Sequence, residues 1–151
     1  MGTRILYVHG IEAIGGAERD LIALLKALDR RKWELHVVCP GTGPFREQLH
    51  AIPVTTHALN LPPWRKVRSL LQRGSAVRCL SALVGQIDPA MIHVNDIWWM
   101  PHTVRAVAGC VAKSVPVVAH VRQEIEPAKV GRYELDLAET VIAISRQIEQ
   151  S

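Results

Sequence analysis

The chain has 151 residues, of which 48% are hydrophobic and 21% charged, and its formal net charge is +4. This balance supports one domain with its own core and excludes wholesale disorder. The three cysteines, Cys39, Cys79 and Cys110, form no Cys-x-x-Cys pair, which favours a reducing compartment over a disulfide framework. No apolar run has the length of a membrane span, and the first residues lack the features of a signal peptide, so we expect a cytoplasmic protein.

Six short runs rich in β-branched residues predict strands at residues 4–9, 34–39, 54–59, 91–95, 117–121 and 141–144. Most of these runs are continuously apolar, as expected of parallel strands that are covered on both faces. Helical patterns separate the runs. The sequence therefore predicts an α/β fold, a single Rossmann-like domain with a parallel sheet and helices on both faces.

The clearest helical pattern extends from Ala17 to Leu28, where apolar residues recur on one face. A short helix is expected over residues 45–51, and a longer helical region over residues 64–86. In the longer region, the apolar stripes before and after Gly74–Ser75 are offset by roughly a third of a turn, which predicts a kink or break there. Residues 146–151 read as the first turn of a helix that lacks a terminating signal, so we expect a truncated chain.

The basic residues are unevenly distributed. No acidic residue occurs between Glu47 and Asp88, whereas this interval contains five basic residues. This local excess of positive charge predicts a local anionic partner rather than general nucleic-acid binding. The candidates for contact with an anionic membrane surface are Trp64, Arg65, Lys66, Arg68 and Arg73. The alternative interpretation is an ordinary solvated basic face.

The turn from Gly10 to Glu18 joins the first strand to the first helix. Free N–H groups and the helix dipole make such a turn a phosphate site, and Gly15 and Gly16 let a phosphate approach the backbone. The spacing is not that of the GxGxxG dinucleotide fingerprint. A plain βα turn that needs glycine for its dihedral angles remains the alternative.

Polar residues close the fourth and fifth predicted strands, at the sheet edge where ligands bind in such folds. Asn95 and Asp96 offer the amide and carboxylate that hold sugar hydroxyls, although Asp96 could instead cap the next helix. Trp98 and Trp99 are expected to pack in the core, with stacking on a sugar as the alternative.

His120 and Arg122 close the fifth strand and alternate, so both side chains point to one side if the strand continues. An imidazole can hydrogen-bond a sugar hydroxyl, and a guanidinium can clamp a phosphate. His9 lies near the same edge without an assigned role, and His36 and His93 are expected to be core or surface residues. The histidine spacing fits no metal signature.

In chain order, these segments resemble the motifs of family 4 glycosyltransferases. The run Gly15-Gly16-Ala17-Glu18-Arg19 matches the family's GGAER, and Trp33-Glu34-Leu35-His36-Val37-Val38 is similar to its GHEVHVV. Residues 43–49, 52–54, 88–94, 115–122 and 143–145 are similar to its GPL…L, IPV, PDVVHVH, VPVVYHVRE and IAVS segments. The chain departs from the family at Asn95-Asp96 and at Arg122-Gln123.

The resemblance implies one half of a retaining enzyme of GT-B architecture, in which two Rossmann-like domains face each other across a cleft. Residues 1–151 correspond to the N-terminal, acceptor-side domain, and the C-terminal donor-binding domain is absent. The implied catalytic residue is His120, the implied donor-phosphate contacts are Gly15 and Gly16, and the implied acceptor contacts are Asn95, Asp96, Arg122 and Glu124. The donor is a nucleotide sugar, and no metal or other cofactor is required.

The expected function is sugar transfer to an acceptor, such as a lipid-linked or cell-surface glycan precursor, at the inner face of the membrane. We expect this chain alone to be inactive. The alternative is a non-catalytic acceptor-binding or interaction module of a split transferase. A dinucleotide-dependent oxidoreductase is disfavoured because the GxGxxG pattern is missing.

Overall fold

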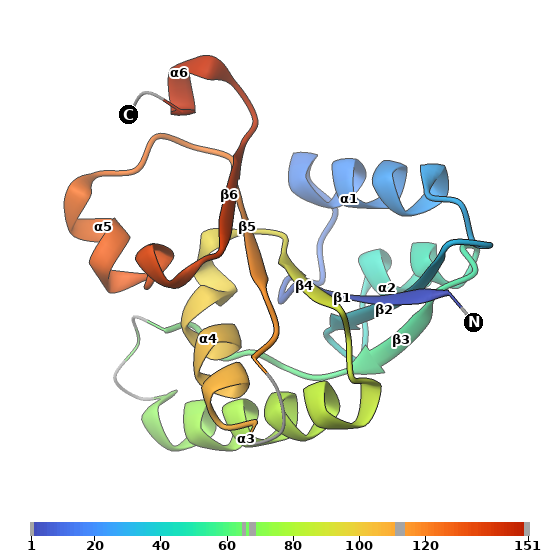
Figure 1. Ribbon diagram of the computed structural model, residues 1–151, viewed down its shortest axis with the longest axis horizontal. Helices are drawn as coiled ribbons and strands as arrows, with labels where there is room; N and C mark the ends of the chain where they lie inside the picture. The colour runs from blue at the N-terminus through green and yellow to red at the C-terminus, as the bar shows by residue number, and fades with distance from the viewer. Residues whose placement is uncertain (1, 65, 67–68, 111–113, 150–151) are drawn as a thin grey trace.

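The computed structural model describes residues 2–64, 66, 69–110 and 114–149 (Figure 1). Within them, parallel strands form a six-stranded sheet in the order β3-β2-β1-β4-β5-β6. The strands are β1 (Thr3–Val8), β2 (Trp33–Cys39), β3 (Thr55–Ala58), β4 (Met91–Val94), β5 (Val117–Val121) and β6 (Thr140–Ala143). Each strand coincides closely with a predicted run, and the predicted parallel Rossmann-like sheet is confirmed.

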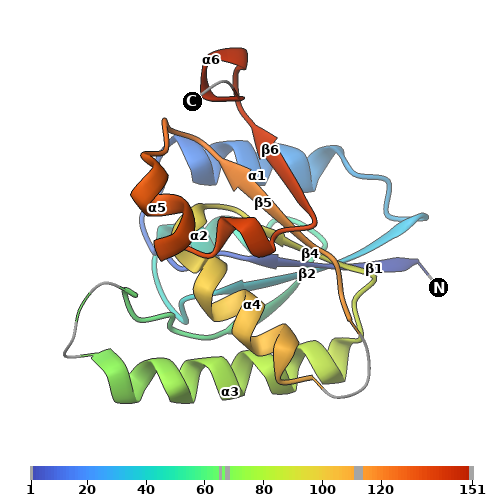
Figure 2. The same ribbon diagram turned by 60° about the vertical axis from the view of Figure 1, so that its left-hand side comes forward.

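Helices cover both faces of the sheet (Figures 1 and 2). Helices α1 (Gly16–Ala27) and α2 (Pro44–Leu49) pack on one face, and α3 (Leu70–Ile87) and α4 (Met100–Ala108) pack on the other. Strand β1 contributes to both cores: Ile5 and Tyr7 face α1 and α2, whereas Leu6 and Val8 face α3 and α4. A continuously apolar strand is therefore buried on both sides, because successive side chains point in opposite directions.

The turn after β1 is held by the turn after β2. The backbone N–H of Phe45 donates to the carbonyl of Glu12 at 3.0 Å. Gly43 adopts a φ of 98°, and a Cβ at this position would lie 2.6 Å from the Cβ of Glu12. Glycine is needed here for both its backbone conformation and the close approach of the two turns.

Helix α3 differs from its prediction. It runs without interruption through Gly74–Ser75, so the predicted break is wrong, and it begins at Leu70 rather than at residue 64. The buried stripe starts at Ala76, whereas Leu70 and Leu71 in the first turn are exposed by 58% and 92%. The first turn of α3 does not pack on the core, so its apolar residues need not lie on the same face as the buried stripe. The offset between the two stripes therefore does not require a break in the helix.

The C-terminal part contains shorter elements around β5 and β6. These are the 3-10 helices η2 (Ile97–Trp99) and η3 (Leu135–Leu137) and the helices α5 (Pro127–Arg132) and α6 (Arg146–Glu149). The predicted turn after β6 is present as α6, and residues 150–151 lie outside the described residues. Among the described helices, none combines the length and apolar character needed to cross a bilayer.

Candidate functional site

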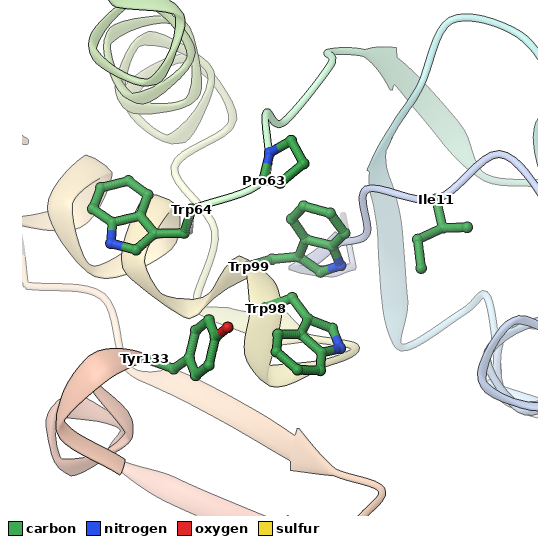
Figure 3. A pocket seen from close by; sticks show the side chains of 6 residues that line it. All are labelled: Ile11, Pro63, Trp64, Trp98, Trp99 and Tyr133. Atoms are coloured by element: carbon green, nitrogen blue, oxygen red, sulfur yellow. The ribbon is translucent and has the colours of Figure 1, made fainter. Parts of the chain in front are cut away.

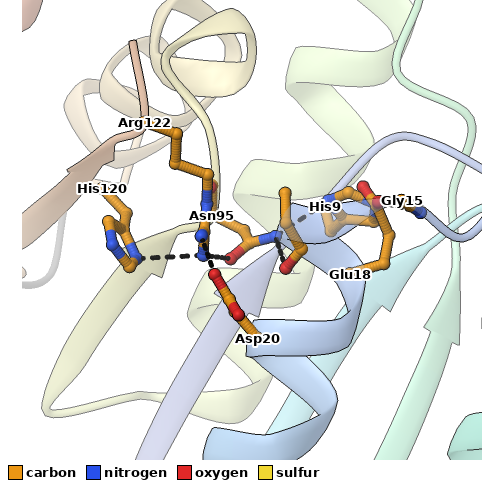
Figure 4. Close-up of polar contacts among 8 residues, drawn as sticks. His9, Gly15, Glu18, Asp20, Asn95, His120 and Arg122 are labelled. Atoms are coloured by element: carbon orange, nitrogen blue, oxygen red, sulfur yellow. Dashed lines mark hydrogen bonds and ion pairs between the residues drawn. The ribbon is translucent and has the colours of Figure 1, made fainter. Parts of the chain in front are cut away.

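The strand order reverses between β1 and β4, and open parallel sheets of this kind bind ligands at the carboxyl ends of the strands beside that reversal. Three segments meet there: the turn from Gly10 to Gly15, the residues after β4, and the end of β5 (Figure 4). This edge contains the polar residues selected from the sequence.

The glycine pair lies at the start of α1 and is exposed. Apart from its chain neighbours and its own helix backbone, no described heavy atom lies within 4 Å of a Cβ built on Gly16, so a ligand has room to approach its backbone. The amide of Gly15 is already occupied, because it donates to Oε2 of Glu18 at 2.7 Å. Of the two predicted phosphate contacts, Gly16 is therefore the more open.

Glu18 and His9 form a buried pair beneath this turn. Oε1 of Glu18 lies 3.1 Å from Nε2 of His9, an ion-pair distance without hydrogen-bond geometry. Burial lowers the pKa of His9, and the nearby Glu18 carboxylate opposes that shift. The sequence assigned neither residue a role. Glu18 stands three residues after the helix-capping Gly15, the spacing of a capping box, and this spacing could have predicted that the Glu18 carboxylate accepts from the Gly15 amide.

Asn95 is buried directly after β4, and its side chain is used within the protein. Its Nδ2 donates to the carbonyl of Ala17 at 3.3 Å and lies 3.4 Å from Nδ1 of His9. These contacts join the end of β4 to the first turn of α1. Asn95 is thus at the predicted place, but its amide positions neighbouring elements rather than projecting into open space.

Arg122 connects three segments of the site (Figure 4). Its Nε donates to the carbonyl of Asn95 at 3.1 Å, and its Nη2 donates to Oδ1 of Asn95 at 3.0 Å. Its Nη1 forms an ion pair with Oδ2 of Asp20 at 2.6 Å. The guanidinium therefore fixes the ends of β4 and β5 against α1, and Asp20 is a member of this network that the sequence analysis missed.

His120 contacts the same guanidinium, with its Nδ1 lying 3.2 Å from Nη2 of Arg122. An arginine can only donate, so Nδ1 accepts and a neutral ring carries its proton on Nε2. Burial, followed by the positive charge of Arg122, lowers the pKa of His120, and Asp20 opposes this shift. The arrangement favours a neutral imidazole with an Nε2–H donor, at the same rim as the start of α1.

Asp96 and Glu124, the remaining predicted acceptor contacts, have different environments. Asp96 is partly buried just before η2, and burial raises its pKa to about 6, although the backbone N–H groups of Ile97 and Trp98 oppose the shift. Its carboxyl group can therefore change protonation state near neutral pH. Glu124 is exposed, and its role in binding stays a prediction.

The two tryptophans after Asp96 line a cavity of about 230 Å³ (Figure 3). Trp99 is 6% exposed and packs beneath Gly10, where an added Cβ would lie 2.7 Å from the indole ring. Trp98 is partly buried and meets Tyr133 edge-on, with ring centroids 4.8 Å apart. Both residues pack in the core, as predicted, and both also present a surface to the cavity.

Two of the predicted membrane contacts, Arg65 and Arg68, lie outside the described residues. Lys66 is exposed. Arg73 instead lies over the ring of Trp64, 5.0 Å from its centroid, and donates to the carbonyl of Lys66 at 2.6 Å. Trp64 and Arg73 thus contact each other, and Arg73 also holds the backbone of the segment before α3.

Across the described part of the chain, no group of three His, Cys, Asp or Glu side chains is placed to hold a metal ion. The expectation that no metal or other cofactor is needed stays a prediction.

The fold defines a Rossmann-like α/β domain whose polar residues gather at the switch point of its sheet. The family model of Glycosyltransferase Family 4 matches residues 14–151. The chain therefore belongs to glycosyltransferase family 4, and the resemblance seen in its motifs is confirmed.

Solved structures show the same fold. The Anabaena protein HepE, in complex with UDP and glucose, has a TM-score of 0.75 at 19% identity and is matched over 98% of this chain and 40% of its own. The lipopolysaccharide outer core galactosyltransferase WaaB, in its apo form, has a TM-score of 0.74 at 14% identity, and the match covers 98% of this chain and 41% of WaaB. MurG of Acinetobacter baumannii has a TM-score of 0.68 at 13% identity, and the match covers 95% of this chain and 41% of MurG. The chain thus spans about two fifths of each, and no curated protein sequence gives a significant match.

Proposed function

We propose that this chain is the acceptor-side half of a retaining glycosyltransferase that moves a sugar from a nucleotide-sugar donor to an acceptor. The observation that carries the proposal is the network that brings His120, through Arg122 and Asn95, to the first turn of α1. Structures of HepE hold UDP, UDP with glucose, or UDP-glucose, which supports a nucleotide sugar as the donor class. The second, donor-binding half is a required partner.

The chemistry follows from the charges in the site. Glycosyl transfer passes through an oxocarbenium-like sugar while negative charge develops on the departing diphosphate. Gly16 and the positive end of the α1 dipole lie where such a charge can be stabilised. The Nε2–H of His120 can donate to a hydroxyl of the transferred sugar, and its neutral state avoids placing a second positive charge near the forming cation.

The test is turnover by this chain combined with a donor-binding half, measured against a panel of nucleotide sugars. We expect His120→Ala to lower kcat by about 100-fold, the scale for removing one transition-state donor, with little change in nucleotide Kd. His120→Gln should recover part of the rate because its amide nitrogen can replace Nε2–H, and His50→Ala, at an exposed position, is the control. An unchanged rate in His120→Ala would remove this residue from the site.

A second proposal concerns the start of α3, which we define as the α3 tip: Lys66, Leu70 and Leu71. Two exposed leucines in the first turn of α3, preceded along the chain by the exposed Lys66, suit a peripheral contact with an anionic membrane at the cytoplasmic face. Lipid-linked glycan precursors are the acceptors that such a contact favours, and cell-envelope polysaccharide synthesis is the corresponding pathway class.

Sedimentation with liposomes tests the α3 tip. We expect binding to anionic vesicles, weaker binding to neutral vesicles, and loss of binding when Leu70 and Leu71 are both replaced by Asp. Leu137→Asp is the matched control, because Leu137 is 59% exposed but lies in η3. Equal binding to both kinds of vesicle would contradict the proposal.

A further inference from the structure

The cavity beside the site has walls built mainly from aromatic rings, and we call it the aromatic pocket (Figure 3). Its lining comes from four separate segments: the β1–α1 turn, the segment before α3, the η2 turn, and the end of α5. The lining residues are Ile11, Pro63, Trp64, Trp98, Trp99 and Tyr133.

The indole of Trp64, which forms one wall of the aromatic pocket, is held in place by three neighbouring side chains. Trp64 lies outside the regular helices and strands, yet the guanidinium carbons of Arg73 and Arg105 lie 5.0 and 4.5 Å from its ring centroid. The buried His102 meets the same ring edge-on at 4.9 Å. These contacts hold the indole in one orientation, so little conformational entropy is lost when a ligand packs on it.

The opposite wall is tied to α4. Nη2 of Arg105 lies 2.5 Å from Oε1 of Glu134, and its Nη1 lies 3.3 Å from Oε2. This two-pronged ion pair holds the backbone next to Tyr133, whose ring stands edge-on to Trp98. The aromatic walls are therefore already arranged before any ligand arrives.

The polarity of the aromatic pocket limits its occupant. No charged side chain is found among its described lining residues, which disfavours the phosphates of a nucleotide. The hydroxyl of Tyr133 points toward the tryptophans of the pocket (Figure 3), so a hydroxylated ring can hydrogen-bond to it, whereas a wholly apolar lipid chain cannot.

A pyranose ring combines the two properties that the walls require. Its axial C–H bonds form an apolar face that packs on an indole, and its hydroxyl groups hydrogen-bond at the ring edge. The cavity volume of about 230 Å³ is smaller than usual for drug-sized ligands and suits a single ring.

The aromatic pocket is lined by segments that adjoin the candidate site along the chain. Trp98 and Trp99 lie in η2, whose N-cap is Asp96, and Ile11 belongs to the turn that leads to the glycine pair. We propose that the aromatic pocket binds a pyranose ring of the acceptor, stacked on its tryptophans. This inference rests on the proposed transferase function, and it moves acceptor recognition from Asn95 and Arg122 to the aromatic walls.

Indole N–H signals in ¹H–¹⁵N NMR spectra of the 151-residue chain test this assignment. Three of the four tryptophans line the aromatic pocket, whereas Trp33 begins β2 at the opposite end of the sheet and serves as an internal control. The probes are methyl glycosides of glucose, galactose and N-acetylglucosamine, with farnesol as the apolar comparison. We expect at least one pyranoside to shift the signals of Trp98 and Trp99 while Trp33 stays unmoved.

Two variants complete the experiment. Trp98→Leu should abolish the pyranoside shift of Trp99, whereas Trp33→Phe should retain it; circular dichroism identifies a variant that fails to fold. If no pyranoside shifts the pocket indoles, if farnesol alone does so, or if Trp33 shifts equally, the inference is wrong.

A separate titration with UDP distinguishes this result from failure of the proposed function. Shifts at the backbone amide of Gly16 report binding at the glycine turn, independently of the aromatic pocket. UDP shifts at Gly16 without any pyranoside response would overturn the pocket assignment alone, whereas no response to UDP by the chain joined to its donor-binding half would count against the transferase function.

Discussion

Arg122 donates to the Nδ1 of His120 at 3.2 Å, although the same guanidinium also bonds Asn95 and Asp20. An arginine held by three partners cannot easily turn toward a ligand. The guanidinium keeps the neutral His120 ring in one tautomer and lowers the pKa of His120. We therefore propose that Arg122 acts as a positioning residue, and its contact with an acceptor stays a prediction.

The first prediction concerns the pH profile of Arg122→Gln. Burial and the Arg122 charge both lower the pKa of His120, so removing the charge should raise this pKa. If neutral His120 is the active form, activity in the variant should be lost at a higher pH on the acid side than in the wild type. The measurement is kcat/KM against pH in the complete transferase, and an unshifted acid limb would contradict the requirement for a neutral His120.

The second prediction separates two glycines by their surroundings. Gly10→Ala should destabilise the fold by about 1–3 kcal/mol, because its Cβ would lie 2.7 Å from Trp99 in a packed region. Gly85→Ala is the matched control in the exposed interior of α3, where no described atom lies within 4 Å of the added Cβ. This control should stabilise by about 0.5–1 kcal/mol, and urea unfolding measures both.

The third prediction separates ligand approach from stability at Gly16. Its added Cβ meets no described atom within 4 Å, so Gly16→Ala should fold at least as stably as the wild type. The same methyl group would occupy the space that a phosphate needs, so nucleotide-sugar binding should weaken by about tenfold, or about 1.4 kcal/mol. Calorimetric titration of the complete transferase measures this loss. Unchanged affinity would show that the donor phosphate does not approach Gly16.

The strands and the location of the site could be predicted because both follow from local patterns. A strand covered on both faces must be continuously apolar, and the polar residues His120 and Asn95 stand where such runs end. The carboxyl ends of parallel strands share one edge of the sheet, so chain order alone places these residues near each other.

The partners of those side chains could not be predicted in the same way. In the sequence, Asp20 is a charged residue on the polar side of a predicted helix, with nothing to mark a partner. Its ion pair with Arg122 depends on how α1 lies relative to the end of β5. The aromatic pocket has the same origin, because Trp64 and Tyr133 come from segments without a shared motif. The predicted break at Gly74 failed because periodicity cannot show whether a turn of helix reaches the core.

The last prediction concerns acid stability and tests the buried histidines as a structural feature. Burial, followed by the charges of His120 and Arg122, lowers the pKa of His93 to about 4, so the folded state binds its proton less readily than the unfolded state does. The free energy of unfolding should therefore fall as the pH drops from about 6.5 to about 4, with His93 contributing at most about 3 kcal/mol to that loss. His93→Phe keeps an aromatic ring beside Tyr7 and should reduce this pH dependence, whereas His50→Phe, at an exposed position, should leave it unchanged. Urea unfolding at a series of pH values measures the effect, and an acid-induced loss that is identical in wild type and His93→Phe would show that His93 is not a source of the acid sensitivity.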